Sequence, residues 1–438
     1  MSAQNLSRRH FLQGVASTAV LGPMVVQAQS KPAAKVNIAC IGVGGKGWSD
    51  MLEVSVGHNI VAICDIDEGR LAKAADKFPK AKKYTSWQKL LEQKDIDAVT
   101  ISTPDHTHAP ATMSAMELGK HVYTQKPLTH DVFESRQLTE FAKEKKLITQ
   151  MGIQHHATAR LKLGVHAIQS GAIGKVKEAH VWTDRPGTFW KQGLERPTKK
   201  DPVPAQVHWN DWLGTAPERP FVTGMYHPFH WRGWWDFGTG ALGDMGCHLM
   251  DPVIDALELG PPKTITAEGP PPTSESGPEW CIVHYTFPGT KQTEKTVDVH
   301  WYEAGLQPDR KLFQAPEDWA GSKNGVLYIG EKGNLFLGFP EMPELFPKEK
   351  FEDYKWPEFA DHNHYQEWTN AVATNGKTSC PFDYSGPLTE TVLLGNVAYR
   401  SGKKIQWDSE NMKATGEPSA DQFIKRTYRE GWNVSGLG

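Results

Sequence analysis

Short apolar runs and helical stretches alternate along the first third of the chain. Four runs rich in β-branched residues predict buried strands: 36–41, 60–64, 98–102 and 121–124. The stretches between and after them predict helices: 48–56, 69–77, 87–93, 109–118 and 131–145. Because strand and helix alternate strictly, the pattern predicts an α/β fold with a parallel, doubly wound sheet over residues 35–152.

The pattern changes after Gly152. A helix over 158–170 and a strand over 176–183 are followed by stretches rich in proline, glycine and tryptophan. Five later runs then predict strands: 264–267, 281–287, 296–301, 325–329 and 334–337. Turn-forming residues such as Gly330-Glu331-Lys332-Gly333 indicate hairpins, so residues 153–438 predict an α+β domain with a large, mostly antiparallel open sheet. Two late helices, near 365–374 and 389–401, are expected to pack on that sheet.

The first thirty residues have the pattern of an export signal. Ser7-Arg8-Arg9-His10-Phe11-Leu12 is a twin-arginine pattern, followed by a weakly apolar run and by Val26-Gln27-Ala28 at the usual cleavage spacing. The run is short of the roughly 20 apolar residues that a membrane span requires. A basic tail is the other alternative. We interpret residues 1–30 as a twin-arginine signal peptide, which predicts a periplasmic protein.

Composition limits the range of partners. A net charge of −3, with 39% hydrophobic and 23% charged residues, is typical of a globular protein, and it indicates neither a nucleic-acid partner nor, after signal cleavage, a membrane partner. The five cysteines are an odd number without CxxC spacing, which argues against a disulfide scaffold. Cys40 and Cys64 fall in predicted buried strands, where thiols usually act as small hydrophobic groups.

A glycine motif joins the first predicted strand to the first helix. Gly42-Val43-Gly44-Gly45-Lys46-Gly47 matches G-x-G-x-x-G in the context that makes this motif a dinucleotide-binding Rossmann fingerprint. Gly42 permits the tight turn, Gly44 lets the backbone approach a pyrophosphate, and Gly47 brings helix and strand together. With Gly45 and Lys46, these residues are predicted to bind the cofactor phosphates at the helix N-terminus.

An acidic residue indicates which dinucleotide binds. Asp65 ends the second predicted strand, about 20 residues after the motif, where a carboxylate accepts the ribose hydroxyls of NAD and repels the 2′-phosphate of NADP. Arg70 lies close behind it, so NADP stays open as the less favoured alternative.

Two polar segments follow the next two predicted strands. They bring further candidate cofactor contacts to the sheet edge where open α/β folds bind ligands: Thr103, Pro104, His106, His108, Gln125 and Lys126. Lys126 stands at a strand end and precedes Pro127. Its ammonium group can polarise a substrate hydroxyl and stabilise a developing alkoxide.

These segments, in this order and spacing, resemble the glucose–fructose oxidoreductase/inositol dehydrogenase family, called Gfo/Idh/MocA. The resemblance continues with Gly171-Ala172-Ile173-Gly174-Lys175-Val176 and with the segment from Gly238 to His248, and it spans residues 35 to 408. It implies an NAD-dependent carbohydrate oxidoreductase. The family's usual glutamate before the lysine is Gln125 here, which removes a charge beside the cofactor.

The resemblance also implies catalytic roles. It pairs Lys126 with Asp244 and His248, which stand four residues apart and therefore share one helix face. His248 would accept the proton of the oxidised hydroxyl, Lys126 would orient and polarise that hydroxyl, and Asp244 would bind substrate or tune the histidine. A metal site at Asp244, Cys247, His248 and Asp251 is the competing interpretation, but no second ligand cluster accompanies it, and we predict no metal.

Tryptophan is unusually frequent. Seven of the 16 tryptophans lie between residues 182 and 235, which fits either a carbohydrate cleft or a core or subunit interface; for Trp209 and Trp212 we expect the latter. The predicted substrate contacts near the catalytic segment are Tyr226, His227, His230, Arg232 and Trp235, together with Asp244. The histidines in His155-His156 and His362-x-His364 are expected to be structural or on the surface.

Export and cofactor together restrict the reaction. Because a periplasm holds little free NAD, we expect tightly bound NAD that is regenerated in each cycle. A second carbonyl compound could reoxidise it, or a glycoside could be oxidised, cleaved by elimination and reduced again, as in the family's NAD-dependent glycosidases. Elimination needs another base, for which Tyr226, His227 and His230 are candidates. A non-catalytic NAD-binding sensor is a third hypothesis. A homo-oligomer formed through the large sheet is also expected from the resemblance.

Overall fold

The computed structural model describes residues 35–438, and the predicted signal peptide lies outside them. The first sheet is parallel and six-stranded, in the order β3-β2-β1-β4-β5-β6. Its strands are β1 (Asn37–Ile41), β2 (Asn59–Cys64), β3 (Lys82–Tyr84), β4 (Ala98–Ile101), β5 (His121–Gln125) and β6 (Thr149–Gly152). The helices between them are α1 (Lys46–Val54), α2 (Glu68–Lys77), α3 (Trp87–Leu91), α4 (Asp105–Glu117) and α5 (Val132–Lys145). The predicted doubly wound parallel sheet is confirmed.

Local signals explain where these helices begin. Asp67 and Ser86 cap α2 and α3 with their side chains, and Asp131 forms a capping box with Glu134 at α5. The analysis of the sequence missed β3 and β6. Both are short, and β3 is polar and largely exposed, so neither has an apolar run that would show it.

The second sheet has nine strands in the order β13-β12-β11-β7-β10-β9-β8-β14-β15. Its strand pairs are antiparallel except for β7 with β10, so the predicted mostly antiparallel sheet is confirmed. The strands are β7 (Val176–Trp182), β8 (Thr264–Glu268), β9 (Ile282–Pro288), β10 (Thr293–Tyr302), β11 (Gly325–Gly330), β12 (Asn334–Gly338), β13 (Glu344–Phe346), β14 (Ile405–Asp408) and β15 (Lys413–Ala414).

Helices and a long loop cover the two faces of this sheet. The α-helices of this part of the chain are α6 (Ala159–Gln169), α7 (Trp209–Leu213), α8 (Gly240–Leu249), α9 (Asp251–Leu257), α10 (His364–Thr374) and α11 (Phe382–Ser401). The 3₁₀ turns are η1 (Gln154–Ala157), η2 (His230–Gly233), η3 (Arg310–Phe313), η4 (Lys348–Lys350) and η5 (Pro418–Phe423). Val181 on one face belongs to the main core with Leu242 of α8, whereas Trp182 on the other face packs on Phe313 of the loop 303–322.

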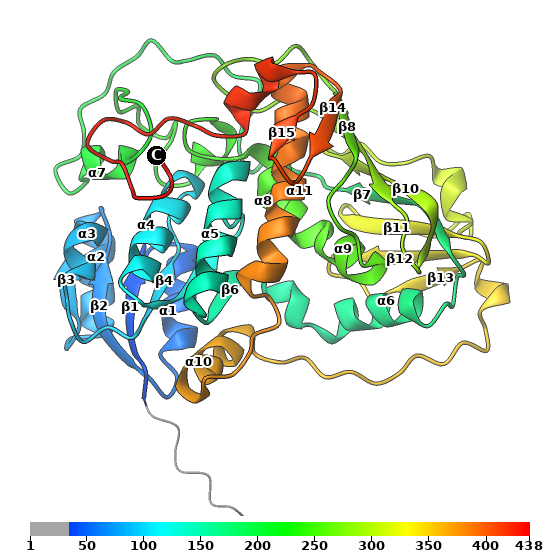
Figure 1. Ribbon diagram of the computed structural model, residues 1–438, viewed down its shortest axis with the longest axis horizontal. Helices are drawn as coiled ribbons and strands as arrows, with labels where there is room; N and C mark the ends of the chain where they lie inside the picture. Colours follow the sequence, from blue (N-terminus) through cyan, green and yellow to red (C-terminus); the bar gives the residue numbers. More distant parts are fainter. Residues whose placement is uncertain (1–34) are drawn as a thin grey trace, which may run out of the picture. The chain divides into compact units, whose positions relative to one another are not determined.

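The expected packing of the two late helices was wrong in part. Trp368 of α10 is completely buried in a cluster with Ile38 and Tyr123, so α10 covers the parallel sheet. Helix α11 is buried along most of its length because it lies between α5 on one side and α8 and β8 on the other (Figure 1). Amphipathic pattern alone does not indicate which of two sheets a helix covers.

Two findings concern the chain as a whole. In the part that the structure describes, no helix is long and apolar enough to cross a membrane. All five cysteines are buried and unpaired, and Cys40 and Cys64 lie in β1 and β2 as predicted.

Candidate active site

The glycine turn after β1 has the close approach that its motif predicts. Gly42 has a φ of +78°, a conformation that favours glycine. A Cβ atom on Gly47 would lie 1.9 Å from the Gly42 carbonyl oxygen, so any side chain there would separate α1 from β1.

A cavity of about 650 Å³ opens beside this turn. Its floor comes from the glycine turn and from the ends of β2 and β4, and its other wall from residues 211–212, 227–229 and 231–232 of the second part of the chain. The predicted cofactor residues that line it are Gly42, Gly44, Gly45, Lys46, Asp65, Thr103 and Pro104. A glycine-rich turn between a strand end and a helix N-terminus, followed by an acidic residue, fits a nicotinamide dinucleotide.

Asp65 accepts hydrogen bonds from the backbone of the glycine turn and so holds the turn in place. Its Oδ2 accepts hydrogen bonds from the backbone N–H groups of Val43 (3.0 Å) and Gly44 (3.1 Å). Burial raises the pKa of Asp65, while these and other backbone donors oppose the rise. Arg70 lies directly over Gly44, where a Cβ would meet its Cδ at 2.4 Å, so both residues stand in the cavity wall. Recognition of the ribose by Asp65 stays a prediction.

Three charged side chains meet where the two sheets approach each other. Lys126 follows β5, and its Nζ donates to Oδ1 of Asp244 at 2.9 Å. Arg232 of η2 donates to the same oxygen at 3.1 Å and also lines the cavity. Burial alone would raise the pKa of Asp244, but Lys126 and Arg232 outweigh it and hold this pKa far below its usual value. Asp244 is therefore an ionised anchor for both cations.

His248 stands one helical turn after Asp244 on α8. Among the described residues its buried Nδ1 has no hydrogen-bond partner. Burial, reinforced by the nearby Lys126 ammonium, lowers its pKa well below 6.5, so the imidazole is neutral. A neutral imidazole with an unpartnered nitrogen beside a lysine can accept a proton from a bound hydroxyl group.

His155 packs edge-on against His248, with ring centroids 5.5 Å apart. Arg160 donates to its Nδ1 at 3.1 Å, so the neutral ring carries its proton on Nε2. Burial and Arg160 lower the pKa of His155 to about 4. His155 was expected to be structural or on the surface; it lies in η1, just after the carboxyl end of β6, a strand that the sequence pattern did not predict.

Asp50 of α1 is a second residue that the sequence analysis missed. This fully buried carboxylate accepts hydrogen bonds from Gln125 Nε2 (2.8 Å), Ser102 Oγ (2.7 Å) and the Tyr365 hydroxyl (2.9 Å), and it pairs with Lys46. Gln125 is thus buried against a carboxylate and is absent from the cavity wall, so its cofactor contact stays a prediction. The available signal was an acidic residue three positions after Gly47, on the buried face of α1.

His106 and His108, which are also predicted cofactor contacts, both have backbone carbonyl partners. Both are buried, and neither lines the cavity. His106 lies between the carbonyls of Trp212 (2.9 Å) and Phe237 (3.2 Å). His108 lies between those of Thr103 (2.8 Å) and Pro127 (2.7 Å), and it therefore ties the segment that carries Lys126 to the end of β4.

The predicted substrate residues divide into two groups. His227 and Arg232 line the cavity, and Arg232 contacts Asp244. Tyr226 is buried, with Arg219 donating to its hydroxyl, and Trp235 is buried in the main core, so neither lines the cavity. His230 is exposed and outside the cavity wall. Periodicity cannot distinguish these cases, because aromatic residues serve both cores and sugar sites.

The tryptophans expected in a core behave largely that way. Trp212 is buried and stacks on Trp209 with ring centroids 4.6 Å apart, although Trp212 also closes one side of the cavity.

The side chains of the competing metal interpretation do not converge. Cys247 is buried against Thr389, while Asp251 pairs with His156 at 3.0 Å and accepts from the Tyr384 hydroxyl. Within residues 35–438, no group of three or more candidate ligands is arranged to hold a metal ion. His156 therefore has a structural partner, as expected.

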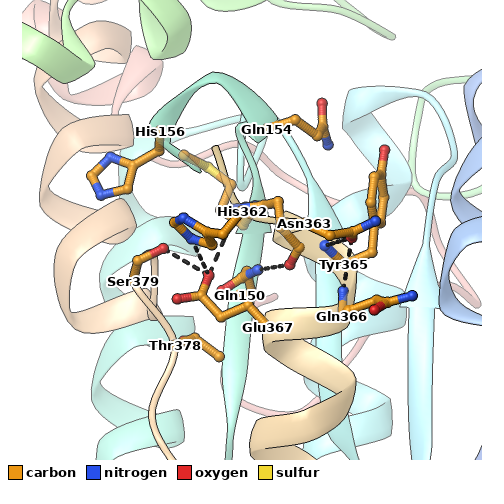
Figure 2. A network of polar contacts seen from close by, with 12 residues as sticks. Gln150, Gln154, His156, His362, Asn363, Tyr365, Gln366, Glu367, Thr378 and Ser379 are labelled. Atoms are coloured by element: carbon orange, nitrogen blue, oxygen red, sulfur yellow. Dashed lines mark hydrogen bonds and ion pairs between the residues drawn. The ribbon is translucent and has the colours of Figure 1, made fainter. Parts of the chain in front are cut away.

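His362 and His364 are structural as well. Figure 2 shows His362 beside Glu367, to which Ser379 donates at 2.8 Å. His364 Nε2 lies 2.9 Å from the carbonyl oxygen of Met151, which attaches the start of α10 to β6.

Comparison with known proteins agrees with this geometry. The family described as "Oxidoreductase family, NAD-binding Rossmann fold" (GFO_IDH_MocA) matches residues 36–153, and its "C-terminal alpha/beta domain" matches residues 162–293. Together the two matches cover more than half of the chain. The cavity therefore belongs to an NAD-binding Rossmann domain.

Two curated relatives illustrate the range of activities nearby. Levoglucosan dehydrogenase of Pseudarthrobacter phenanthrenivorans is 26% identical over 41% of this chain and 38% of its own length. Glycosyl hydrolase family 109 protein 1 of Shewanella sp. strain ANA-3 is 31% identical over 32% of this chain and 37% of its own length. The chain thus spans less than half the length of these relatives.

A solved structure supports the fold. The WlbA dehydrogenase of Chromobacterium violaceum, crystallised with NADH and UDP-GlcNAcA, superposes with a TM-score of 0.60 over 86% of this chain and 96% of that one. At 17% sequence identity, this likeness establishes the architecture alone.

Proposed function

We propose that this chain oxidises a hydroxyl group of a sugar, polyol or glycoside, because it belongs to the Gfo/Idh/MocA family of NAD-binding oxidoreductases. The observation that carries this proposal is the Lys126–Asp244–Arg232 cluster with the neutral His248 nearby. Arg232 lines the NAD cavity, whereas Lys126, Asp244 and His248 lie behind it, outside the cavity wall. NAD, when bound, supplies the hydride acceptor.

The chain's own residues have distinct tasks in this reaction. Lys126, held at 2.9 Å by the ionised Asp244, donates to the substrate oxygen and stabilises the charge that develops on it. His248 takes the hydroxyl proton, since its ring is neutral and lies near Lys126. Arg232 reaches both Asp244 and the cavity, so it orients the substrate hydroxyls.

Redox-neutral hydrolysis of a glycoside is the second candidate, and the similarity to glycosyl hydrolase family 109 proteins favours it. Oxidation of one hydroxyl acidifies the neighbouring C–H bond, the glycosidic bond then breaks by elimination, and water addition and hydride return complete the cycle. Of the bases considered from the sequence, Tyr226 is enclosed and His230 lies outside the cavity. His227, the third of those bases, lines the cavity and is the remaining candidate.

The proposal includes export and a closed redox cycle. The twin-arginine pattern at residues 7–12 supports passage of the folded protein to the periplasm with NAD already bound. Regeneration of that NAD within each turnover then removes the need for an external pool.

Purification without added cofactor tests the closed cycle. We expect absorbance near 260 and 340 nm from bound dinucleotide, and turnover of sugars or aryl glycosides without added NAD. Protein that emerges free of cofactor and needs millimolar NAD would contradict tight binding.

Product analysis separates the two candidates. Release of the aglycone without net oxidation indicates the glycosidase, whereas an oxidised sugar paired with a reduced carbonyl compound indicates the oxidoreductase. Undiminished turnover in Lys126→Ala would refute the assigned role of this lysine.

Replacement of both signal arginines, Arg8 and Arg9, by lysine should retain the protein in the cytoplasm, as cell fractionation would show.

A further inference from the structure

A second cavity, of about 570 Å³, lies where β7 and β12 end and β11 begins. The ring of Phe339, which follows β12, forms part of its wall. The same ring lies 4.1 Å from the His155 centroid and 5.8 Å from the His248 centroid. Phe339 therefore connects the lining of the second cavity to the proposed catalytic histidine.

The lining of this cavity combines aromatic rings with hydrogen-bonding groups. Trp182, Phe313 and Trp319 make its inner part, where Trp182 and Phe313 are almost completely buried. Polar side chains line the rest: Gln307, Arg310, Ser322, Lys323, Asn324 and Glu341. Trp319 is partly exposed and offers apolar surface to the C–H face of a sugar ring, the polar groups can bind its hydroxyls, and the volume is within the usual range of roughly 300–1,000 Å³ for ligand pockets.

The loop 303–322 that encloses the cavity is held in place by its own contacts. The Ser322 carbonyl accepts hydrogen bonds from Trp182 Nε1 (3.0 Å) and from Gln307 Nε2 (3.1 Å). Arg310 donates to the carbonyls of Pro316 (3.0 Å) and Trp319 (2.7 Å). A ligand that enters would meet a preformed site and would lose little binding free energy to loop ordering.

The charges around the cavity argue against a strongly anionic ligand. The guanidinium group of Arg310 already serves backbone carbonyls, and the Glu341 carboxylate, which accepts from Ser322 Oγ at 3.0 Å, adds a negative charge. Among the described residues, Lys323 is the one lining cation without a side-chain or carbonyl partner. One lysine beside a carboxylate is a poor match for a diphosphate, which is usually bound by several donors.

We propose that this cavity binds the second sugar unit of a di- or oligosaccharide whose neighbouring unit is placed at Lys126 and His248. This inference rests on the proposed function, and it holds for dehydrogenation and for glycoside cleavage alike. It makes the protein selective for substrates longer than one sugar unit.

The substitution Ala320→Trp provides the test. Ala320 is exposed and lines the cavity, so a tryptophan there fills part of the cavity without removing any polar contact. The probes are three pairs of sugars: glucose with cellobiose, galactose with lactose, and N-acetylglucosamine with chitobiose. With the purified NAD-loaded protein we expect a disaccharide to have the higher kcat/KM. In Ala320→Trp the KM for that disaccharide should rise by at least about tenfold, which corresponds to one lost set of sugar contacts, while monosaccharide turnover stays unchanged.

Leu306→Trp is the matched control, since Leu306 is exposed on the same loop and does not line the cavity. It should leave both members of each pair unaffected. Titration calorimetry with the same sugars measures their binding affinity independently of turnover. A protein that oxidises none of them would refute the proposed function, while its affinities would still test the second cavity. Disaccharides that bind no more tightly than monosaccharides, an unaltered Ala320→Trp, or preferential binding of UDP-sugars would each overturn the inference.

Discussion

Gln125→Glu would place a second carboxylate against Asp50. The amide Nε2 of Gln125 now donates to Asp50 Oδ2 at 2.8 Å, and both side chains are buried. Two charges about 4 Å apart repel by about 4 kcal/mol at the effective dielectric constant of roughly 20 that applies in proteins. The alternative is to protonate one carboxyl group, which costs about 1.4 kcal/mol for each pH unit above the unfolded-state pKa of about 4.3.

The two routes set the expected magnitude. Protonation of one carboxyl group costs about 1 kcal/mol at pH 5 and about 4 kcal/mol at pH 7. At pH 7 this cost equals the repulsion between two charged carboxylates, so the destabilisation increases no further above that pH. The sign follows because the native variant binds more protons than its unfolded chain, so its stability falls as pH rises. The deficit of Gln125→Glu should therefore be small at pH 5 and several-fold larger at pH 7.

Urea unfolding of wild type and variant at pH 5, 6, 7 and 8 measures this deficit. The double variant Asp50→Asn/Gln125→Glu keeps one carboxylate at the contact and should lose the pH dependence, although Lys46 and Tyr365 lose their present partner. A Gln125→Glu protein that is as stable as wild type at pH 8, or a double variant with the same pH dependence as the single one, would refute the reasoning.

Three further predictions concern catalysis, stability and the cofactor. His248→Ala should lower kcat by about 10²–10⁴, the usual contribution of a general base, while the absorbance of bound NAD is unchanged; full activity would disprove its role. Burial disfavours the charged form of His156, but Asp251 outweighs it and raises the pKa of His156 to about 12. The pair therefore stabilises the folded protein fully below the unfolded-state histidine pKa of about 6.5, and this stabilisation declines as pH rises toward 12. Calorimetric melting should accordingly show a larger deficit for His156→Gln at pH 6 than at pH 9, and an equal deficit would contradict the assignment. Gly47→Ala should abolish co-purification of NAD, because its Cβ would lie 1.9 Å from a carbonyl oxygen of the same turn, whereas Gly260→Ala, with open space around it, should retain the cofactor.

Local patterns in the sequence were enough to predict those parts of this protein that depend on neighbouring residues. The alternation of strand and helix, the glycine turn of Gly42 to Gly47, and the placement of Asp65 and Lys126 at strand ends all follow from patterns within a few tens of residues. The spacing of Asp244 and His248 likewise placed both on one face of α8. These features could be predicted because periodicity and local backbone geometry determine them.

Only the tertiary structure decided which polar and aromatic side chains reach the site. Tyr365 meets Asp50 across 315 residues, and Arg232 and Lys126 meet at Asp244, contacts that no local pattern encodes. Tyr226 and Trp235 resemble substrate ligands in the sequence, yet both are buried because the surrounding loops pack around them. Burial and pairing over long distances depend on how whole layers stack, and they decide which groups stay free for chemistry.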